Sequence, residues 1–161
     1  MYRKAFFAIC LNGFALAFTW GITVTNIPWL FDRVGIKETD LGIWFTIFAV
    51  LQLIFSQLSG RVIVPLIGTT KTLMLGQLSF AIFPYIFITA SNIQIFFLSS
   101  IPLSIAAGLI FPTIASSTNF IENKTKRIYQ TYQQASFSFG FIISGIFASL
   151  FFYLNLYPPH I

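Results

Sequence analysis

Residues 6–31 read FFAICLNGFALAFTWGITVTNIPWLF and contain no Asp, Glu, Lys or Arg. Because the hydrocarbon core of a bilayer is about 30 Å thick, roughly 20 consecutive apolar residues are enough for a membrane-spanning helix. Four similar stretches follow, and Arg61 is the one charged residue that falls within them. The sequence therefore predicts an all-α membrane protein in which residues 1–161 form one transmembrane bundle. Its expected spans are residues 6–31, 41–66, 72–89, 93–117 and 135–156.

The composition excludes an ordinary soluble domain. Hydrophobic residues make up 57% of the chain and charged residues 8%, and the mean hydropathy is +0.84. A soluble domain carries about 25% charged residues. The net charge of +5 is explained by basic residues in the loops at the membrane surface, so we expect a lipid bilayer as the surroundings and no nucleic-acid partner.

The loop charges predict the orientation of the chain. Alternate loops carry seven basic residues on one side of the membrane and two on the other, and the second side also holds three of the four acids. Since basic loops stay in the cytoplasm, we expect the N-terminus inside and, with five spans, the C-terminus outside. The expected location is the plasma (inner) membrane, as a multi-pass protein.

Small residues recur every four positions in three of the spans. Small side chains let the backbones of membrane helices approach each other, so these stripes favour helix–helix contact faces, with chance recurrence in a chain rich in small residues as the alternative. The stripes are Gly13, Ala17 and Gly21 in the first span, Ser100, Ser104 and Gly108 in the fourth, and Ser136, Gly140, Ser144 and Ala148 in the fifth.

Polar residues also share one face of the first span. Asn12, Thr19, Thr23 and Asn26 are spaced by seven, four and three residues, which places them on the same side of a helix. Amides are costly in hydrocarbon unless they are hydrogen-bonded, so this face should look into the bundle or a watery cavity. Hydrogen bonding between helices and the lining of a substrate path are the two interpretations that stay open.

Chemistry-bearing groups are scarce in the sequence. The expected spans contain no acid or His for a proton relay, and the chain shows no metal-ligand cluster, phosphate-cradling loop or nucleophile–base pair. We therefore expect no enzyme activity, no catalytic residue, no bound metal and no cofactor.

Three stretches together resemble the major facilitator superfamily of secondary transporters. Residues 60–71, GRVIVPLIGTTK, are similar to its cytoplasmic signature loop through Gly60, Arg61, Gly68 and Lys71. The acid of that loop is absent here. Residues 106–127, AAGLIFPTIASSTNFIENKTKR, look like the family's fourth span and its exit. Residues 132–150, YQQASFSFGFIISGIFASL, look like its fifth, with a sugar-permease-like character.

The resemblance implies a fold and a function. Members of the superfamily have two six-span halves with the substrate site between them near the midplane. Five spans then suggest a truncated N-terminal half that needs the missing C-terminal half or self-association. By resemblance, the substrate-lining candidates are Asn12, Thr19, Thr23, Asn26, Thr113 and Gln134.

The implied activity is transport by alternating access of a small, neutral and polar solute. The alternative is a small accessory or assembly protein of the membrane that transports nothing.

Overall fold

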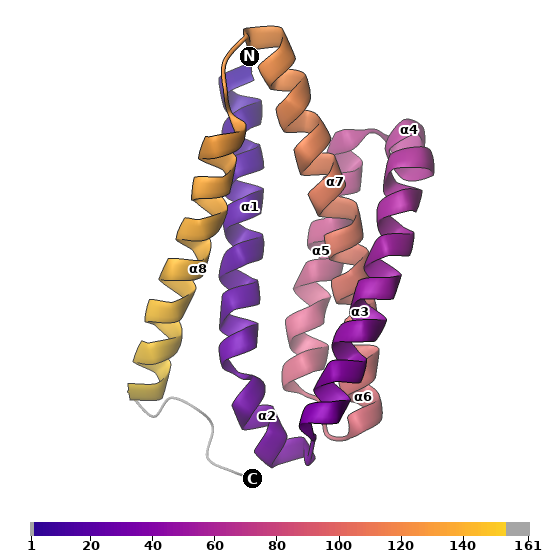
Figure 1. The fold of residues 1–161 in the computed structure, drawn as a ribbon, viewed down its shortest axis with the longest axis vertical. Helices are drawn as coiled ribbons and strands as arrows, with labels where there is room; N and C mark the ends of the chain where they lie inside the picture. The colour runs from indigo at the N-terminus through magenta and orange to yellow at the C-terminus, as the bar shows by residue number, and fades with distance from the viewer. Residues whose placement is uncertain (1, 154–161) are drawn as a thin grey trace. The chain divides into compact units, whose positions relative to one another are not determined.

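The computed structural model describes residues 2–153, and this range is helical with no β-strand (Figure 1). The prediction of an all-α membrane protein is therefore confirmed. The helices are α1 (Tyr2–Thr25), α2 (Ile27–Val34), α3 (Glu38–Leu58), the π-helical turn η1 (Ser59–Ile63), α4 (Val64–Ile67), α5 (Thr69–Ile88), α6 (Ile93–Leu98), α7 (Ser100–Thr125) and α8 (Gln130–Tyr153).

Within the described residues, four helical stretches are long and apolar enough to cross a membrane. They are Tyr2–Thr25, Glu38–Ile67, Thr69–Ile88 and Ile93–Thr125. The fifth expected span, residues 135–156, corresponds to α8, which has 24 residues. Residues 154–156 of that span lie outside the described residues. At 1.5 Å per residue, 24 residues give a helix of about 36 Å, which is also a membrane-crossing length.

The first expected span, residues 6–31, is divided into two helices. α1 ends at Thr25, and the backbone N–H of Asn26 bonds to the carbonyl of Thr23 at 3.1 Å, which forms a tight turn before α2. The side-chain amide of Asn26 also donates to the carbonyl of Ile22 at 2.7 Å. Pro28 has no N–H to donate to Val24, so a continuous helix would lose a hydrogen bond here. These local groups explain why the helix ends where the hydropathy continues.

The second expected span, residues 41–66, contains a π-helical turn. The backbone N–H of Val64 bonds to the carbonyl of Ser59, five residues earlier. Pro65 follows directly, and in an α-helix its ring would clash with the carbonyl of Arg61. A wider turn relieves that clash, and this accounts for the position of η1 between α3 and α4.

The described chain packs as two compact units. One consists of residues up to Trp29 together with residues from Thr118 onwards, and the other is Leu30–Ser117. The first unit contains α1, the end of α7 and α8. The second contains α3 to α6 and most of α7.

In the unit Leu30–Ser117, α7 packs against both α3 and α5. A Cβ atom placed on Gly108 would lie 2.5 Å from the Phe55 Cβ, and one placed on Gly76 would lie 2.5 Å from the Cγ1 of Ile110. The hydroxyl of Ser104 donates to the carbonyl of Phe48 at 3.1 Å. Bare backbone at the two glycines is therefore what allows these three helices to pack closely.

Candidate functional site

α1 and α8 lie side by side and run in the same direction (Figure 1). The hydroxyl of Ser136 donates to the carbonyl of Cys10 at 2.8 Å. One turn further on, a Cβ atom on Gly140 would lie 2.6 Å from the carbonyl oxygen of Phe14 and 2.9 Å from the Cβ of Ala17. The backbones of the two helices are therefore in direct contact along this seam.

The same seam extends over the rest of both helices. At Gly21, an added Cβ would collide with the hydroxyl of Ser144, and at Gly13 it would lie 3.7 Å from the Nε2 of Gln133. Ala17 thus lies opposite Gly140 and Gly21 lies opposite Ser144, whereas Gly13 lies opposite Gln133. Aromatic rings lie beside them, with Phe14 against Phe139 and Phe18 against Phe147, at centroid distances of 6.0 and 5.7 Å.

The polar face of α1 is largely satisfied by its own helix. Asn12 donates to the carbonyl of Ala8 at 2.9 Å, and Thr23 donates to the carbonyl of Thr19 at 2.9 Å. Asn26 donates to Ile22 as described above. Thr23 is buried, whereas Asn12, Thr19 and Asn26 are half-buried. Because these donors bond to their own helix, the face presents less hydrogen-bonding capacity than its composition suggests.

The glutamines at the start of α8 differ sharply in environment. Gln134, the expected lining candidate, is exposed, whereas its neighbour Gln133 is buried and lies beside Gly13 of α1. Adjacent residues on a helix point about 100° apart, so only one of them can face α1. Because the two adjacent residues are both glutamine, the local sequence could not predict which of them faces α1.

Thr113, the other lining candidate, lies in the contact between α7 and the π-helical turn. Its hydroxyl is 3.4 Å from that of Ser59, and both residues are buried. The carbonyl of Thr113 accepts hydrogen bonds from the hydroxyls of Ser116 and Ser117, at 3.1 and 2.6 Å. Thr113 and Ser59 therefore form a buried pair of hydroxyls, whereas Ser116 is exposed and Ser117 is half-buried.

The signature loop covers η1, α4 and the start of α5. Gly60 and Arg61 lie in the π-helical turn, and both are exposed. Gly68 joins α4 to α5 with φ at 81°, a conformation that residues with a Cβ rarely adopt. Lys71 is exposed in the first turn of α5. This backbone conformation explains why a glycine occupies position 68.

An aromatic cluster in the unit Leu30–Ser117 was not predicted from the sequence. The indole N–H of Trp44 lies 3.1 Å from both the carbonyl of Phe96 and the hydroxyl of Ser99. Rings of Phe83, Phe87 and Phe96 surround it, with centroids 5.6–6.4 Å away. Trp44 is 1% exposed and is the largest fully buried side chain in the described residues. A buried indole in hydrocarbon surroundings needs such an acceptor.

Two charged residues bond to helix ends. Arg33 donates to the carbonyl of Ile88, the last residue of α5, at 2.9 Å. The Oε1 of Glu122 accepts hydrogen bonds from the backbone N–H groups of Tyr129 and Gln130, at 2.6 and 2.7 Å, where α8 begins. Cations favour helix C-termini and anions favour N-termini, so both bonds also suit the helix dipole.

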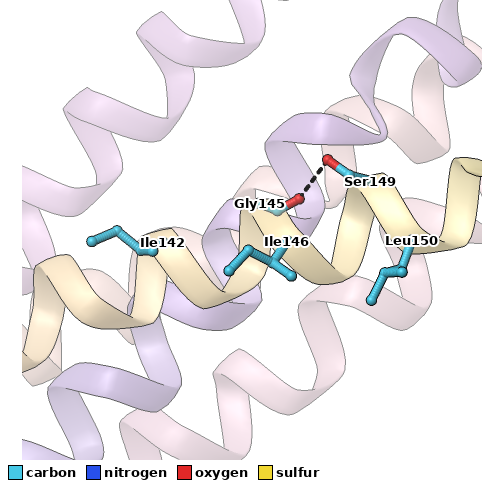
Figure 2. Close-up of a pocket in the computed structure, with 5 residues that line it drawn as sticks. All are labelled: Ile142, Gly145, Ile146, Ser149 and Leu150. Atoms are coloured by element: carbon cyan, nitrogen blue, oxygen red, sulfur yellow. Dashed lines mark hydrogen bonds between the residues drawn. The ribbon is translucent and has the colours of Figure 1, made fainter.

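The other side of α8 carries an open apolar groove. It is lined by residues of this helix, and the hydroxyl of Ser149 donates to the carbonyl of Gly145 at 2.8 Å (Figure 2). A Cβ atom on Gly145 would meet no atom within 4 Å. The lining residues are Ile142, Gly145, Ile146, Ser149 and Leu150. Among the described residues, no group of three His, Cys, Asp or Glu side chains is arranged to hold a metal ion.

Comparison with known proteins gives a consistent result. A family model described as Major Facilitator Superfamily matches residues 9–157. Multidrug resistance protein 2 of Bacillus subtilis is 29% identical over 88% of this chain and 36% of its own length. The quinolone resistance protein NorA of Staphylococcus aureus is 23% identical over 88% of this chain and 36% of its own length. Multidrug resistance protein 1 of Bacillus subtilis is 28% identical over 84% of this chain and 35% of its own length. No solved structure matches significantly.

Proposed function

Because the chain belongs to the Major Facilitator Superfamily, we propose that it supplies part of a secondary transporter that moves a small organic solute by alternating access. The observation that carries this proposal is the family match over residues 9–157, which reaches into every long helix. The chain spans about 36% of the length of the first curated relatives. Transport therefore requires further helices, supplied by a C-terminal half or by a second copy of this chain.

Export of a partly apolar, drug-like compound is the first candidate for the activity. The names of the relatives refer to resistance against multiple drugs and quinolones. The arrangement along α1 agrees with such a solute, because Asn12, Thr23 and Asn26 donate to carbonyls of their own helix. Such a face is poorly suited to replace the full hydration shell of a strongly polar solute.

A small neutral polar solute is the second candidate. It is favoured by the absence of charged residues between Lys4 and Asp32 in the sequence, which leaves hydroxyls and amides as the polar groups of α1. A strongly charged solute would lack a counter-charge on this helix. The role of a non-transporting accessory protein remains the alternative to both.

Transport assays with a supplied second part test the proposal. The chain is produced alone, and together with the part of Bacillus subtilis multidrug resistance protein 2 that lies beyond the matched region. We expect the pair, but not the chain alone, to export a quinolone from energised vesicles. Uptake of a radiolabelled polyol instead of quinolone export would favour the second candidate. A stable pair that moves neither solute would contradict the transport proposal and favour the accessory role.

A further inference from the structure

Basic residues from two distant segments gather at one end of the unit that contains α1 and α8. Arg3 and Lys4 lie in the first turn of α1, and Lys124, Lys126 and Arg127 lie at the end of α7 and in its connection to α8. All five side chains are exposed. We call these five residues the basic end.

Packing between α1 and α8 brings the two segments together. The rings of Phe6 and Tyr129 lie with their centroids 4.5 Å apart, one turn beyond Arg3 in α1 and two residues beyond Arg127 in the connection. The parallel course of the helices places the start of α1 beside the connection between α7 and α8 (Figure 1). The basic end therefore forms only when α1 and α8 pack together.

The acidic residue in this region, Glu122, is hydrogen-bonded to the backbone. Glu122 accepts the N–H groups of Tyr129 and Gln130. Its own carbonyl accepts the N–H of Lys126 at 2.8 Å, and Lys126 adopts a left-handed conformation with φ at 55°. The carboxylate thus orders the connection. Five basic residues against one acidic residue leave a surplus of four positive charges.

Apolar and aromatic residues accompany the charges. Ile128 is 74% exposed next to Arg127, and Tyr132 is 66% exposed at the start of α8. Tyr2 is exposed beside Arg3. Tyrosines are enriched where membrane helices meet the headgroup layer, and a basic cluster next to a spanning helix attracts anionic lipids. The residues beside the basic end are therefore those expected at headgroup depth.

We propose that the basic end binds the phosphate of an anionic phospholipid headgroup. Lys124, Lys126 and Arg127 supply the main contacts and Arg3 and Lys4 complete them, while Ile128 and Tyr132 lie against the lipid's glycerol and upper acyl region. The exposed apolar residues favour a lipid over a free anion, because a soluble phosphate would gain nothing from them.

Lipid retention by the purified full chain tests this proposal. The protein is equilibrated with equimolar phosphatidylglycerol and phosphatidylcholine in detergent, and bound lipids are counted by native mass spectrometry. We expect preferential retention of phosphatidylglycerol. The variant Lys124→Gln/Lys126→Gln should lower this retention at least about fivefold, because two of the three main contacts to the headgroup are lost and one basic residue in contact with an anionic lipid contributes an effect of that order.

The matched control is Arg61→Gln/Lys71→Gln, which removes the same charge from exposed positions of the other unit. We expect it to retain phosphatidylglycerol like the parent chain. Equal losses in both double variants, or no preference in the parent, would overturn the proposal. Circular dichroism of each variant verifies that helix content is unchanged.

A competition arm separates a lipid from a soluble anion. Inorganic phosphate and sodium chloride are added at equal ionic strength. We expect both to lower retention equally, through screening alone. Displacement of the lipid by low millimolar phosphate, but not by chloride, would show a site for a free anion and would overturn the assignment to lipid.

Discussion

Gly140 of α8 lies against the main chain of α1 at Phe14, and a Cβ atom at Gly140 would stand 2.6 Å from the Phe14 carbonyl oxygen. A carbonyl in a helix cannot move aside as a flexible side chain can. The close approach of α1 and α8 therefore depends on the missing side chain at this position.

Replacement of Gly140 by Leu should separate α1 from α8. Overpacking costs about 1–3 kcal/mol in a tight core, and a clash with main chain lies at the upper end of that range or beyond it. Gly145→Leu is the matched control, because its added Cβ meets no atom within 4 Å. Thermal unfolding in detergent should show a large loss for Gly140→Leu and a small one for Gly145→Leu. Similar losses would mean that the helices are not held at this seam.

Replacement of Trp44 by Phe should weaken the aromatic cluster. The variant keeps a ring but loses the indole N–H that faces Phe96 and Ser99. Hydrogen bonds between membrane helices contribute about 0.6–1.7 kcal/mol, so we expect a loss of about 1–2 kcal/mol in unfolding free energy in detergent. Phe7→Leu, at an exposed position of α1, should change it by less than half as much. A neutral Trp44→Phe would contradict the role of the hydrogen bond.

Replacement of Glu122 by Ala should loosen the connection between α7 and α8. Two backbone N–H groups would lose their acceptor, at a cost of about 1–2 kcal/mol. Limited trypsin digestion at Lys124, Lys126 and Arg127 should then be several-fold faster. Glu122→Gln keeps an acceptor oxygen and should show a smaller increase, and exposed Asn123→Ala should show none. Equal digestion of Glu122→Ala and the parent would rule out this function of the carboxylate.

The seven-to-two distribution of basic residues predicts the orientation of the loops. In a Cys10→Ser background, a cysteine at Asn123 should react with a membrane-impermeant maleimide only after the cells are opened. A cysteine at Ser91, between α5 and α6, should react in intact cells. Both residues are exposed, so access to solvent does not separate them. The reverse labelling pattern would overturn the predicted orientation.

Asn26 is the lining candidate that we choose for a test of transport. In the paired transport assay, Asn26→Ala should lower the transport rate about five- to tenfold, the equivalent of one hydrogen bond. Co-purification of the two parts should stay unchanged. Exposed Asn119→Ala serves as the control. A rate equal to that of the parent would remove Asn26 from the transport path.

The sequence by itself determined the class of the protein and most of its helices. Membrane insertion depends on the summed apolarity of a contiguous stretch, which is a local property that can be read without any partner. The four-residue spacing of small residues is local too. It predicts close packing at Gly140 and Gly108, and the structure leaves no room for a side chain at either position.

Only the tertiary structure decided which surfaces meet. Three features join residues that are far apart in sequence. They are the pairing of α1 with α8, the burial of Gln133 in place of Gln134, and the enclosure of Trp44 by three phenylalanines. Each feature depends on the rotation and register of whole helices. A shift of one position along a helix turns the side-chain direction by about 100°. Apolar periodicity in a membrane cannot fix that rotation, because lipid and protein surroundings are equally apolar.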